Sequence, residues 1–140
     1  MPLVRISVYQ STPPSDHKAI ADAVYEAMRE TINIPEGDKF ILVTAHPAGE
    51  MHIDPTFQGM KRTERFILTQ IFLSKGRTVG TKQALYKRIA ERLHEATGVS
   101  TEDVMTVLTE VTYVDWSFGK GEVQFVLNPP TWVPIPAGEN

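Results

Sequence analysis

Apolar and polar residues alternate near the start of the chain, from Leu3 to Tyr9. Every second residue from Val4 to Val8 is a branched apolar one, which is the period of a half-buried β-strand. Two prolines at positions 13–14 interrupt this pattern, and Ser15 is expected to cap a helix that follows. Apolar side chains then recur every three or four positions, as on the buried face of an amphipathic helix: Ile20, Val24, Ala27, Met28 and Thr31.

The strand and helix pattern is repeated further along the chain. Residues 40–44 predict a second strand, residues 65–73 a third, and residues 104–112 a fourth. Between the third and fourth strands, a helix is expected to begin after Thr78 or Thr81 and to end at Gly98. Its apolar face consists of Leu85, Ile89, Leu93 and Ala96.

The two halves can be aligned as duplicate β-α-β units, with Asp38 opposite Asp103. Such a unit implies parallel strands joined by a right-handed crossover. We therefore predict an α/β (α+β) fold with one four-stranded sheet, two helices on one face, a short C-terminal hairpin and an extended arm. The chain is expected to be a single domain, with the first repeat at about 2–46, a loop at 47–64, the second repeat at about 65–112, and the hairpin and proline-rich arm at 113–140.

Two helices leave the other face of the predicted sheet uncovered. Because large exposed apolar patches are rare on monomers, we expect this face to pack against other subunits. The C-terminal arm has four prolines between positions 128 and 136, which favour an extended chain. Its apolar residues Trp132, Val133 and Ile135 are costly to expose, so packing on a neighbouring subunit is favoured over a disordered tail.

Composition narrows the class of protein. The chain has 140 residues, enough for a hydrophobic core, and its net charge of −3 gives no basic footprint for nucleic acid. No apolar run approaches the roughly 20 residues of a membrane-spanning helix. The absence of cysteine excludes disulfides and thiol chemistry. We expect a cytoplasmic protein that binds neither nucleic acid nor membranes.

Pro2 is the first candidate for chemistry. A small second residue normally allows the initiator Met1 to be removed, and removal would expose the secondary amine of Pro2. Burial or a nearby cation lowers the pKa of an amine, so a terminal proline can act as a general acid or base near neutral pH. The alternative is structural, because proline is also tolerated at the first residue of a strand.

Three motifs accompany Pro2: Pro-Glu-Gly-Asp-Lys-Phe at 35–40, Gly-Arg-Thr at 76–78 followed by Lys-Gln-Ala-Leu-Tyr at 82–86, and Asp-Trp-Ser-Phe-Gly-Lys-Gly at 115–121. Together with the duplication, they resemble the tautomerase superfamily of amino-terminal proline enzymes, in particular the malonate semialdehyde decarboxylase-like branch. The resemblance covers about residues 2–127. It implies a homotrimer that acts on small carboxylated carbonyl or enol compounds without a metal or organic cofactor.

The resemblance also implies roles for particular residues. Pro2 corresponds to the catalytic acid or base, and Asp38 to an acidic residue that assists the proline or a water molecule. Arg77 corresponds to an arginine that binds the substrate carboxylate or polarises its carbonyl. The decarboxylase has a second arginine where this chain has Lys75, a departure that weakens the decarboxylase assignment, and Lys75 is expected to bind substrate as a second positive charge. Aromatic residues of the substrate pocket correspond to Trp116, Phe118 and Phe125.

Several alternatives remain open at this stage. Cations near Pro2 favour the neutral amine and a general base, whereas Asp38 favours the protonated amine and a general acid. A base fits keto-enol tautomerisation of a phenylpyruvate-like compound, and an acid fits decarboxylation or hydration of malonate semialdehyde. A non-enzymatic trimeric binding protein on the same scaffold is the third hypothesis. No metal is expected, because His46, His52 and Asp54 match no common ligand spacing.

Overall fold

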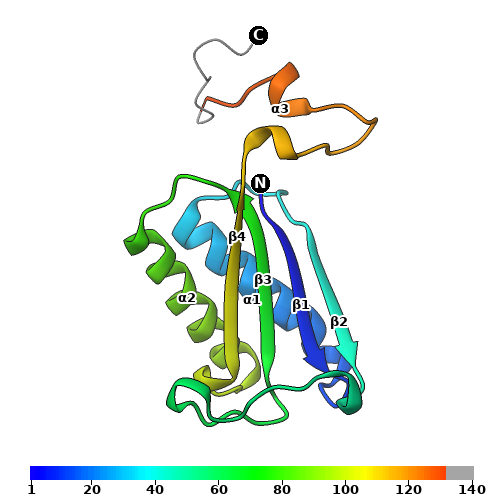
Figure 1. The fold of residues 1–140 in the computed structure, drawn as a ribbon, viewed down its shortest axis with the longest axis vertical. Helices are drawn as coiled ribbons and strands as arrows, with labels where there is room; N and C mark the ends of the chain where they lie inside the picture. The colour runs from blue at the N-terminus through cyan, green and yellow to red at the C-terminus, as the bar shows by residue number, and fades with distance from the viewer. Residues whose placement is uncertain (132–140) are drawn as a thin grey trace.

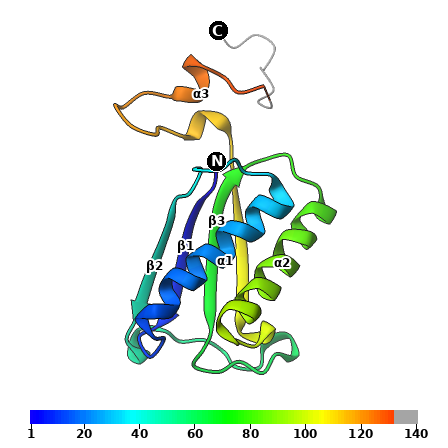
Figure 2. The same cartoon turned by 180° about the vertical axis from the view of Figure 1, so that it is seen from behind.

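The computed structural model describes residues 1–131, and it places two helices on one face of a four-stranded sheet (Figures 1 and 2). The predicted packing of Trp132, Val133 and Ile135 therefore lies outside the described residues. The principal elements are β1 (Leu3–Tyr9), α1 (Pro14–Ile32), β2 (Ile41–His46), β3 (Ile67–Ser74), α2 (Val79–Thr97), β4 (Val104–Val111) and a short α3 (Gln124–Leu127).

The sheet has the strand order β2-β1-β3-β4, and this order reflects the duplication. β1 pairs parallel to β2, β3 pairs parallel to β4, and the central β1–β3 pair is antiparallel. Val4 pairs with Ile41 in the first unit, and Thr69 pairs with Thr106 in the second, so counterparts lie 65 positions apart. The predicted β-α-β units are confirmed, and the antiparallel centre relates them by an approximate twofold axis.

The ends of the helices follow from local chemistry. Both helices end at a residue in the left-handed region, Asn33 after α1 and Gly98 after α2, which are again 65 positions apart. Thr78 caps α2 as expected, since its side chain accepts a hydrogen bond from the N–H of Thr81. The prediction of Ser15 as the cap of α1 is wrong. That helix begins at Pro14, whose fixed φ and missing N–H suit the first helical position, and it has no side-chain cap.

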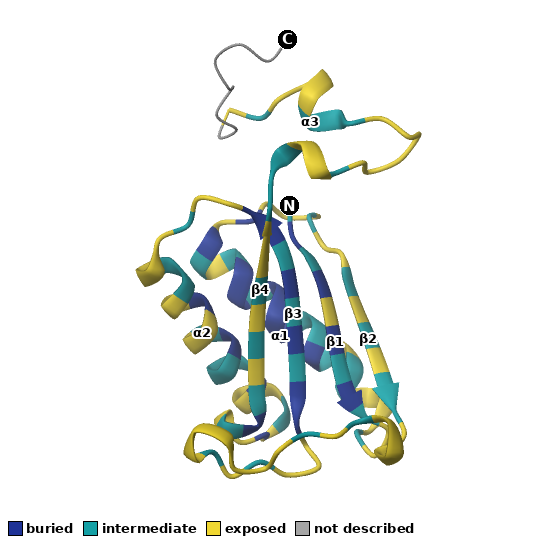
Figure 3. Ribbon diagram, in the orientation of Figure 1, coloured by how far each residue is buried: buried dark blue, intermediate teal, exposed yellow. Residues whose placement is uncertain are grey.

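The core lies between the sheet and the two helices. Alternate residues of the strands face α1 and α2, and this layer contains the side chains with almost no exposed surface (Figure 3). The opposite face of the sheet is partly open, with Leu42, Met105 and Val107 each more than 40% exposed. The most fully buried large residues are Phe66, Ile6, Ile20, Met28, Ile71, Leu73, Leu85, Ile89 and Leu93.

The segment after β4 lies beyond the end of the sheet at which the chain begins (Figures 1 and 2). The expected C-terminal hairpin consists of one antiparallel bridge, between Gly119 and Glu122, and α3 follows it. This segment covers the start of β1 and the end of β3, so it provides one wall of the site described below. Within residues 1–131, no helix is long and apolar enough to span a membrane.

Candidate active site

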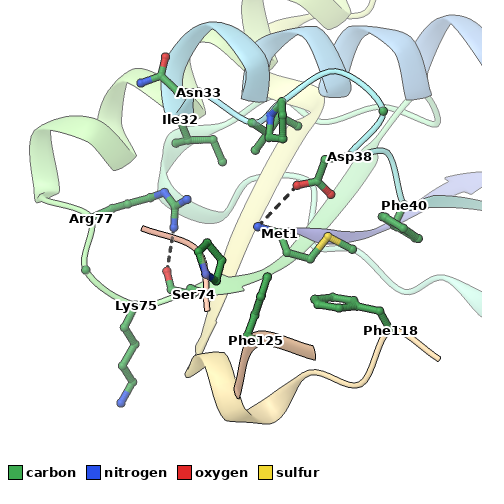
Figure 4. A pocket seen from close by; sticks show the side chains of 15 residues that line it. Met1, Ile32, Asn33, Asp38, Phe40, Ser74, Lys75, Arg77, Phe118 and Phe125 are labelled. Carbon is green, nitrogen blue, oxygen red and sulfur yellow. Dashed lines mark hydrogen bonds and ion pairs between the residues drawn. The ribbon is translucent and has the colours of Figure 1, made fainter. Parts of the chain in front are cut away.

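A cavity of about 890 Å³ lies at the end of the sheet where β1 begins and β3 ends. These two chain positions meet because β1 and β3 are antiparallel neighbours. The end of α1 and the turn before β2 form a second wall, and the segment after β4 forms a third (Figure 4). The cavity is lined by Met1, Ile32, Asn33, Ile34, Pro35, Gly37, Asp38, Phe40, Ser74, Lys75, Gly76, Arg77, Phe118, Phe125 and Pro130.

The amino terminus of the chain is inside this cavity. The amine nitrogen of Met1 lies 3.6 Å from Oδ2 of Asp38, and both groups are largely buried. Burial lowers the pKa of the amine, Asp38 opposes this shift, and the positive charge of Arg77 adds to it. Burial likewise raises the pKa of Asp38, against the effect of the nearby amine. The end of β1 thus places an amine, a carboxylate and a guanidinium within electrostatic reach of one another.

Asp38 is positioned by a tight turn between α1 and β2. Gly37 adopts a φ of +85°, and its N–H donates a 3.1 Å hydrogen bond to the hydroxyl of Tyr25 on α1. The N–H of Asp38 donates to the carbonyl of Pro35. The second carboxylate oxygen, Oδ1, is buried and has no hydrogen-bond partner among the described residues. One acceptor position of Asp38 is therefore unused by the described residues.

Arg77 is held in the loop that connects β3 to α2. Its Nη1 donates a 2.8 Å hydrogen bond to the carbonyl of Ser74. The loop is attached to β4 through Glu110, which accepts a hydrogen bond from the N–H of Gly76. Glu110 also accepts a 2.6 Å hydrogen bond from Nζ of Lys82 on α2. Burial lowers the pKa of Arg77, and Glu110 opposes the shift, so the guanidinium is partly desolvated but still charged.

Lys75 borders the same cavity, but its side chain has a different direction. Figure 4 shows it extending away from Met1 and Asp38. Its charge contributes to the lowered pKa of Asp115, which is caused mainly by hydrogen bonds from Thr112. Arg77 is therefore the cation that faces the amine, and Lys75 lies at the margin of the cavity.

Aromatic side chains form the wall contributed by the C-terminal segment. Phe118 and Phe125 meet edge to face with centroids 4.8 Å apart, and both line the cavity. Trp116 stacks on Phe118 at 5.8 Å and supports it from behind, without lining the cavity itself. The charged groups and these rings leave space between them for a ligand with a polar head and an apolar body.

The structure brings most of the predicted site residues together. Asp38, Arg77, Lys75, Phe118 and Phe125 all border the cavity. Pro2 is buried directly behind Met1, so its nitrogen is a peptide nitrogen in this chain and becomes an amine only when Met1 is removed. Several further residues line the cavity that the sequence motifs did not single out as site residues, among them Phe40, which ends the motif at 35–40, and Ile32, Asn33, Ser74 and Pro130.

Comparisons with known proteins agree with this arrangement. A family described as "Tautomerase enzyme" matches residues 38–119, and a second family of the same description matches residues 2–59. Two proteins of Bacillus subtilis (strain 168), the probable tautomerases YrdN and YusQ, are 32% and 33% identical to this chain. Each alignment covers 90% of this chain, and it covers 97% of YrdN and 99% of YusQ.

Solved structures of similar proteins also match this chain. The FG41 malonate semialdehyde decarboxylase inhibited by 3-bromopropiolate is 34% identical, with a TM-score of 0.86 over 94% of this chain and 99% of that one. A fused 4-OT, described as a symmetric trimer, is 22% identical with a TM-score of 0.71 over 86% of this chain and 94% of that one. The second likeness concerns the fold alone.

Proposed function

This chain belongs to the tautomerase family of enzymes, and we propose that it uses the amine of Pro2, freed by removal of Met1, to tautomerise a small carboxylated carbonyl or enol compound. One observation carries the proposal. The amino terminus lies buried in a cavity, 3.6 Å from Asp38 and within electrostatic reach of Arg77. An amine held in this way can exchange a proton with a substrate, and the cation opposite it can hold a carboxylate.

The proposed reaction needs one proton to move twice. From the keto form, the neutral Pro2 amine takes a proton from the carbon next to the carbonyl, and the electron pair of that C–H bond forms the new C=C bond. Charge then develops on the carbonyl oxygen, where a nearby donor or cation stabilises it. In the second transfer the protonated Pro2 gives this proton to the oxygen, which forms the enol and restores the neutral amine. Arg77 holds the carboxylate, and Asp38 stabilises the proline while it is protonated.

The electrostatics favour a base over an acid. For the amine that occupies this position in the structure, burial and Arg77 together outweigh Asp38, and its pKa is lowered. Pro2 would enter the same environment after Met1 is lost. A lowered pKa leaves more of the amine neutral at physiological pH, which is the form that removes a proton.

The size of the cavity supports an aromatic or similarly large substrate. At about 890 Å³ it is in the upper part of the range for small-molecule sites. Phe40, Phe118 and Phe125 line it together with the charged groups, and this mixture suits a phenyl-bearing 2-oxo acid (Figure 4). Phenylpyruvate and its enol are therefore our first test substrates.

Decarboxylation or hydration of malonate semialdehyde is the second candidate. The overall likeness to the FG41 malonate semialdehyde decarboxylase favours it. Two features count against it: Lys75 stands where the resemblance implies a second arginine, and its side chain extends away from Asp38. Turnover of malonate semialdehyde faster than enol phenylpyruvate would reverse our order of preference.

We also propose that the protein is a homotrimer. The face of the sheet opposite the helices exposes Leu42, Met105 and Val107, which a neighbouring subunit would cover. Sedimentation should give the mass of three chains at micromolar concentration, without a detectable monomer. A monomer at that concentration would contradict the proposal.

The decisive experiment compares the protein with and without Met1. Intact mass identifies a species lighter by one methionine residue, and this species should convert enol phenylpyruvate to the keto form. A protein that carries an uncleaved N-terminal extension should lose nearly all activity, because an amide nitrogen is neither a base nor an acid here. Pro2→Ala keeps an amine and should retain part of the activity. Full activity with the extension in place would exclude the mechanism, and a trimmed protein that turns over neither substrate would favour the non-enzymatic binding protein.

A further inference from the structure

We propose that Ser74 is a substrate-binding residue whose hydroxyl shares the substrate carboxylate with Arg77, an inference that rests on the proposed function. Ser74 is the last residue of β3, and it lines the cavity. It is only 9% exposed, and its hydroxyl oxygen is buried without a hydrogen-bond partner among the described residues. Buried hydroxyls are normally paired, so an unpaired one on a cavity wall needs an explanation.

The position of Ser74 opposite Met1 provides that explanation. Leu3 pairs with Phe72 in the antiparallel β1–β3 ladder, and continuing this register by two residues brings Met1 opposite Ser74. Both residues border the same cavity. Removal of Met1 would therefore take away the residue beside Ser74 and open its hydroxyl to the space in which a substrate binds.

The hydrogen bond between Arg77 and Ser74 determines what enters that space. Nη1 of Arg77 donates to the carbonyl of Ser74, which holds the guanidinium against the end of β3. A carboxylate bound to the remaining N–H groups of Arg77 would lie beside the serine hydroxyl. That hydroxyl has a proton to donate and no acceptor within the described chain, so a carboxylate oxygen satisfies it.

The chain contains a matched control on the same strand. Thr69 is completely buried, and its hydroxyl also lacks a partner among the described residues. Unlike Ser74, it does not line the cavity. If Ser74 were merely an unpaired hydroxyl tolerated by the fold, removing either hydroxyl would leave ligand binding unchanged.

The test measures binding of 3-phenylpropanoate, a carboxylate that cannot tautomerise, to protein whose loss of Met1 is confirmed by mass. A hydrogen bond from a neutral hydroxyl to a carboxylate is worth enough that Ser74→Ala should raise the Kd about 10-fold. Ser74→Thr keeps the hydroxyl and should remain close to the parent, and Thr69→Val should leave the Kd unchanged. In turnover, Ser74→Ala should raise KM while kcat changes little, because the carboxylate contact stabilises the bound substrate and the transition state equally.

The possible outcomes separate the two proposals. An unchanged Kd in Ser74→Ala, an equal loss in Thr69→Val, or no binding by the parent protein would overturn the role of Ser74. Tight binding by the parent without turnover would reject the tautomerase reaction, and the Kd ratio would still decide about Ser74. If Ser74→Ala does not fold, Ser74→Cys takes its place, since a thiol is a weak donor of similar size. An intermediate Kd then supports the inference, and a Kd equal to that of the parent overturns it.

Discussion

The two β-α-β units each have a turn between helix and strand at the same place, and the space beside that turn is open in the first unit and filled in the second. Asp38 lies after α1 and Asp103 lies at the equivalent place after α2, 65 positions further along. At the Asp38 end there is a cavity of about 890 Å³, whereas the pocket at the equivalent place beside α2 measures about 240 Å³. Similar backbones therefore give one end that can accept a ligand and one that is packed with its own chain.

The Asp103 end is filled by the loop that precedes β3. Asp103 is 1% exposed, and its two oxygens accept hydrogen bonds of 2.6 Å from the N–H and the hydroxyl of Thr63. Arg62 donates to the carbonyl of Glu102 and lies over the ring of Phe66. Phe66 is the counterpart of Met1, and its backbone N–H donates to the carbonyl of Thr63, so an ordinary peptide group stands where the first unit has its amine.

The comparison shows what a site requires beyond the fold. Thr12 is the counterpart of Arg77, so the second end has no cation at the position that faces the amine in the first. Both oxygens of Asp103 are paired, while Oδ1 of Asp38 is left without a partner among the described residues. A free chain end, an arginine in the loop after the strand and an incompletely paired carboxylate distinguish the candidate active site from its structural duplicate, where Arg65 borders the smaller pocket and donates to the carbonyl of Thr97.

Removing each carboxylate in turn should give the largest contrast. Asp103→Ala removes a buried carboxylate that accepts two hydrogen bonds from Thr63 and holds the loop before β3 in place, and we expect the free energy of unfolding to fall by about 3 kcal/mol. Asp38→Ala should leave stability nearly unchanged, because it removes a carboxylate with an unpartnered oxygen. Denaturant titration of both variants measures the difference. Equal losses of stability would mean that the two ends are structurally alike.

Arg77, at the open end, and Arg62, at the filled end, should differ in their contribution to activity. Arg77→Ala removes a charge-assisted contact to the substrate carboxylate and should lower kcat/KM by roughly 30-fold. Lys75→Ala should have a smaller effect, since its side chain extends away from Asp38. Arg62→Ala, at the filled end, serves as the control and should leave kcat/KM unchanged. An unaltered kcat/KM in Arg77→Ala would remove this residue from the site.

The pH profile should identify the role of Asp38. If Pro2 is the base, kcat/KM rises with pH as the amine loses its proton. The negative charge of Asp38 raises the pKa of the amine at this end of β1. Asp38→Asn should therefore move the rising limb of the pH profile to lower pH. The parent limb itself should lie below the ordinary amino-terminal pKa of 8.0. A kcat/KM that falls with increasing pH would instead identify the amine as an acid.

Loss of the Tyr25 hydroxyl should have the smallest effect. Tyr25→Phe removes the acceptor for the N–H of Gly37 and loosens the turn before Asp38, at a cost of about 1 kcal/mol in stability. kcat should decrease more than KM increases, because Arg77 and its carboxylate contact are not touched. Steady-state kinetics together with thermal unfolding separates these effects. A change confined to KM would argue that this turn contacts substrate directly.

The fold could be predicted well because its pattern is local and repeated. Alternation from Val4 to Val8, the helical spacing from Ile20 to Thr31 and the Gly98 stop signal are each encoded by neighbouring residues. The exact strand limits were less accurate: β2 begins at Ile41 and β3 at Ile67, one and two residues later than expected. The residue at which a strand begins depends on its hydrogen-bond partners in neighbouring strands.

The candidate site was only partly predictable. Asp38 and Arg77 were expected from motifs, since each follows a glycine turn with a recognisable sequence. Ser74 has no such signal, because its position opposite Met1 follows from the antiparallel pairing of β1 with β3. The direction of the Lys75 side chain was likewise beyond the sequence, since it depends on how the segment after β4 covers the sheet.

The antiparallel centre of the sheet has a consequence for how such a protein can change. An amine of this kind is a property of a polypeptide terminus, and no exchange of one side chain for another can create it at the start of β3, where the chain runs through without interruption. A circularly permuted gene whose product begins at Phe66 could supply an amine there, and joining the original ends would remove the first one. Amino acid replacement can tune the first half indefinitely, but only a rearrangement of the gene could bring the same chemistry to the second.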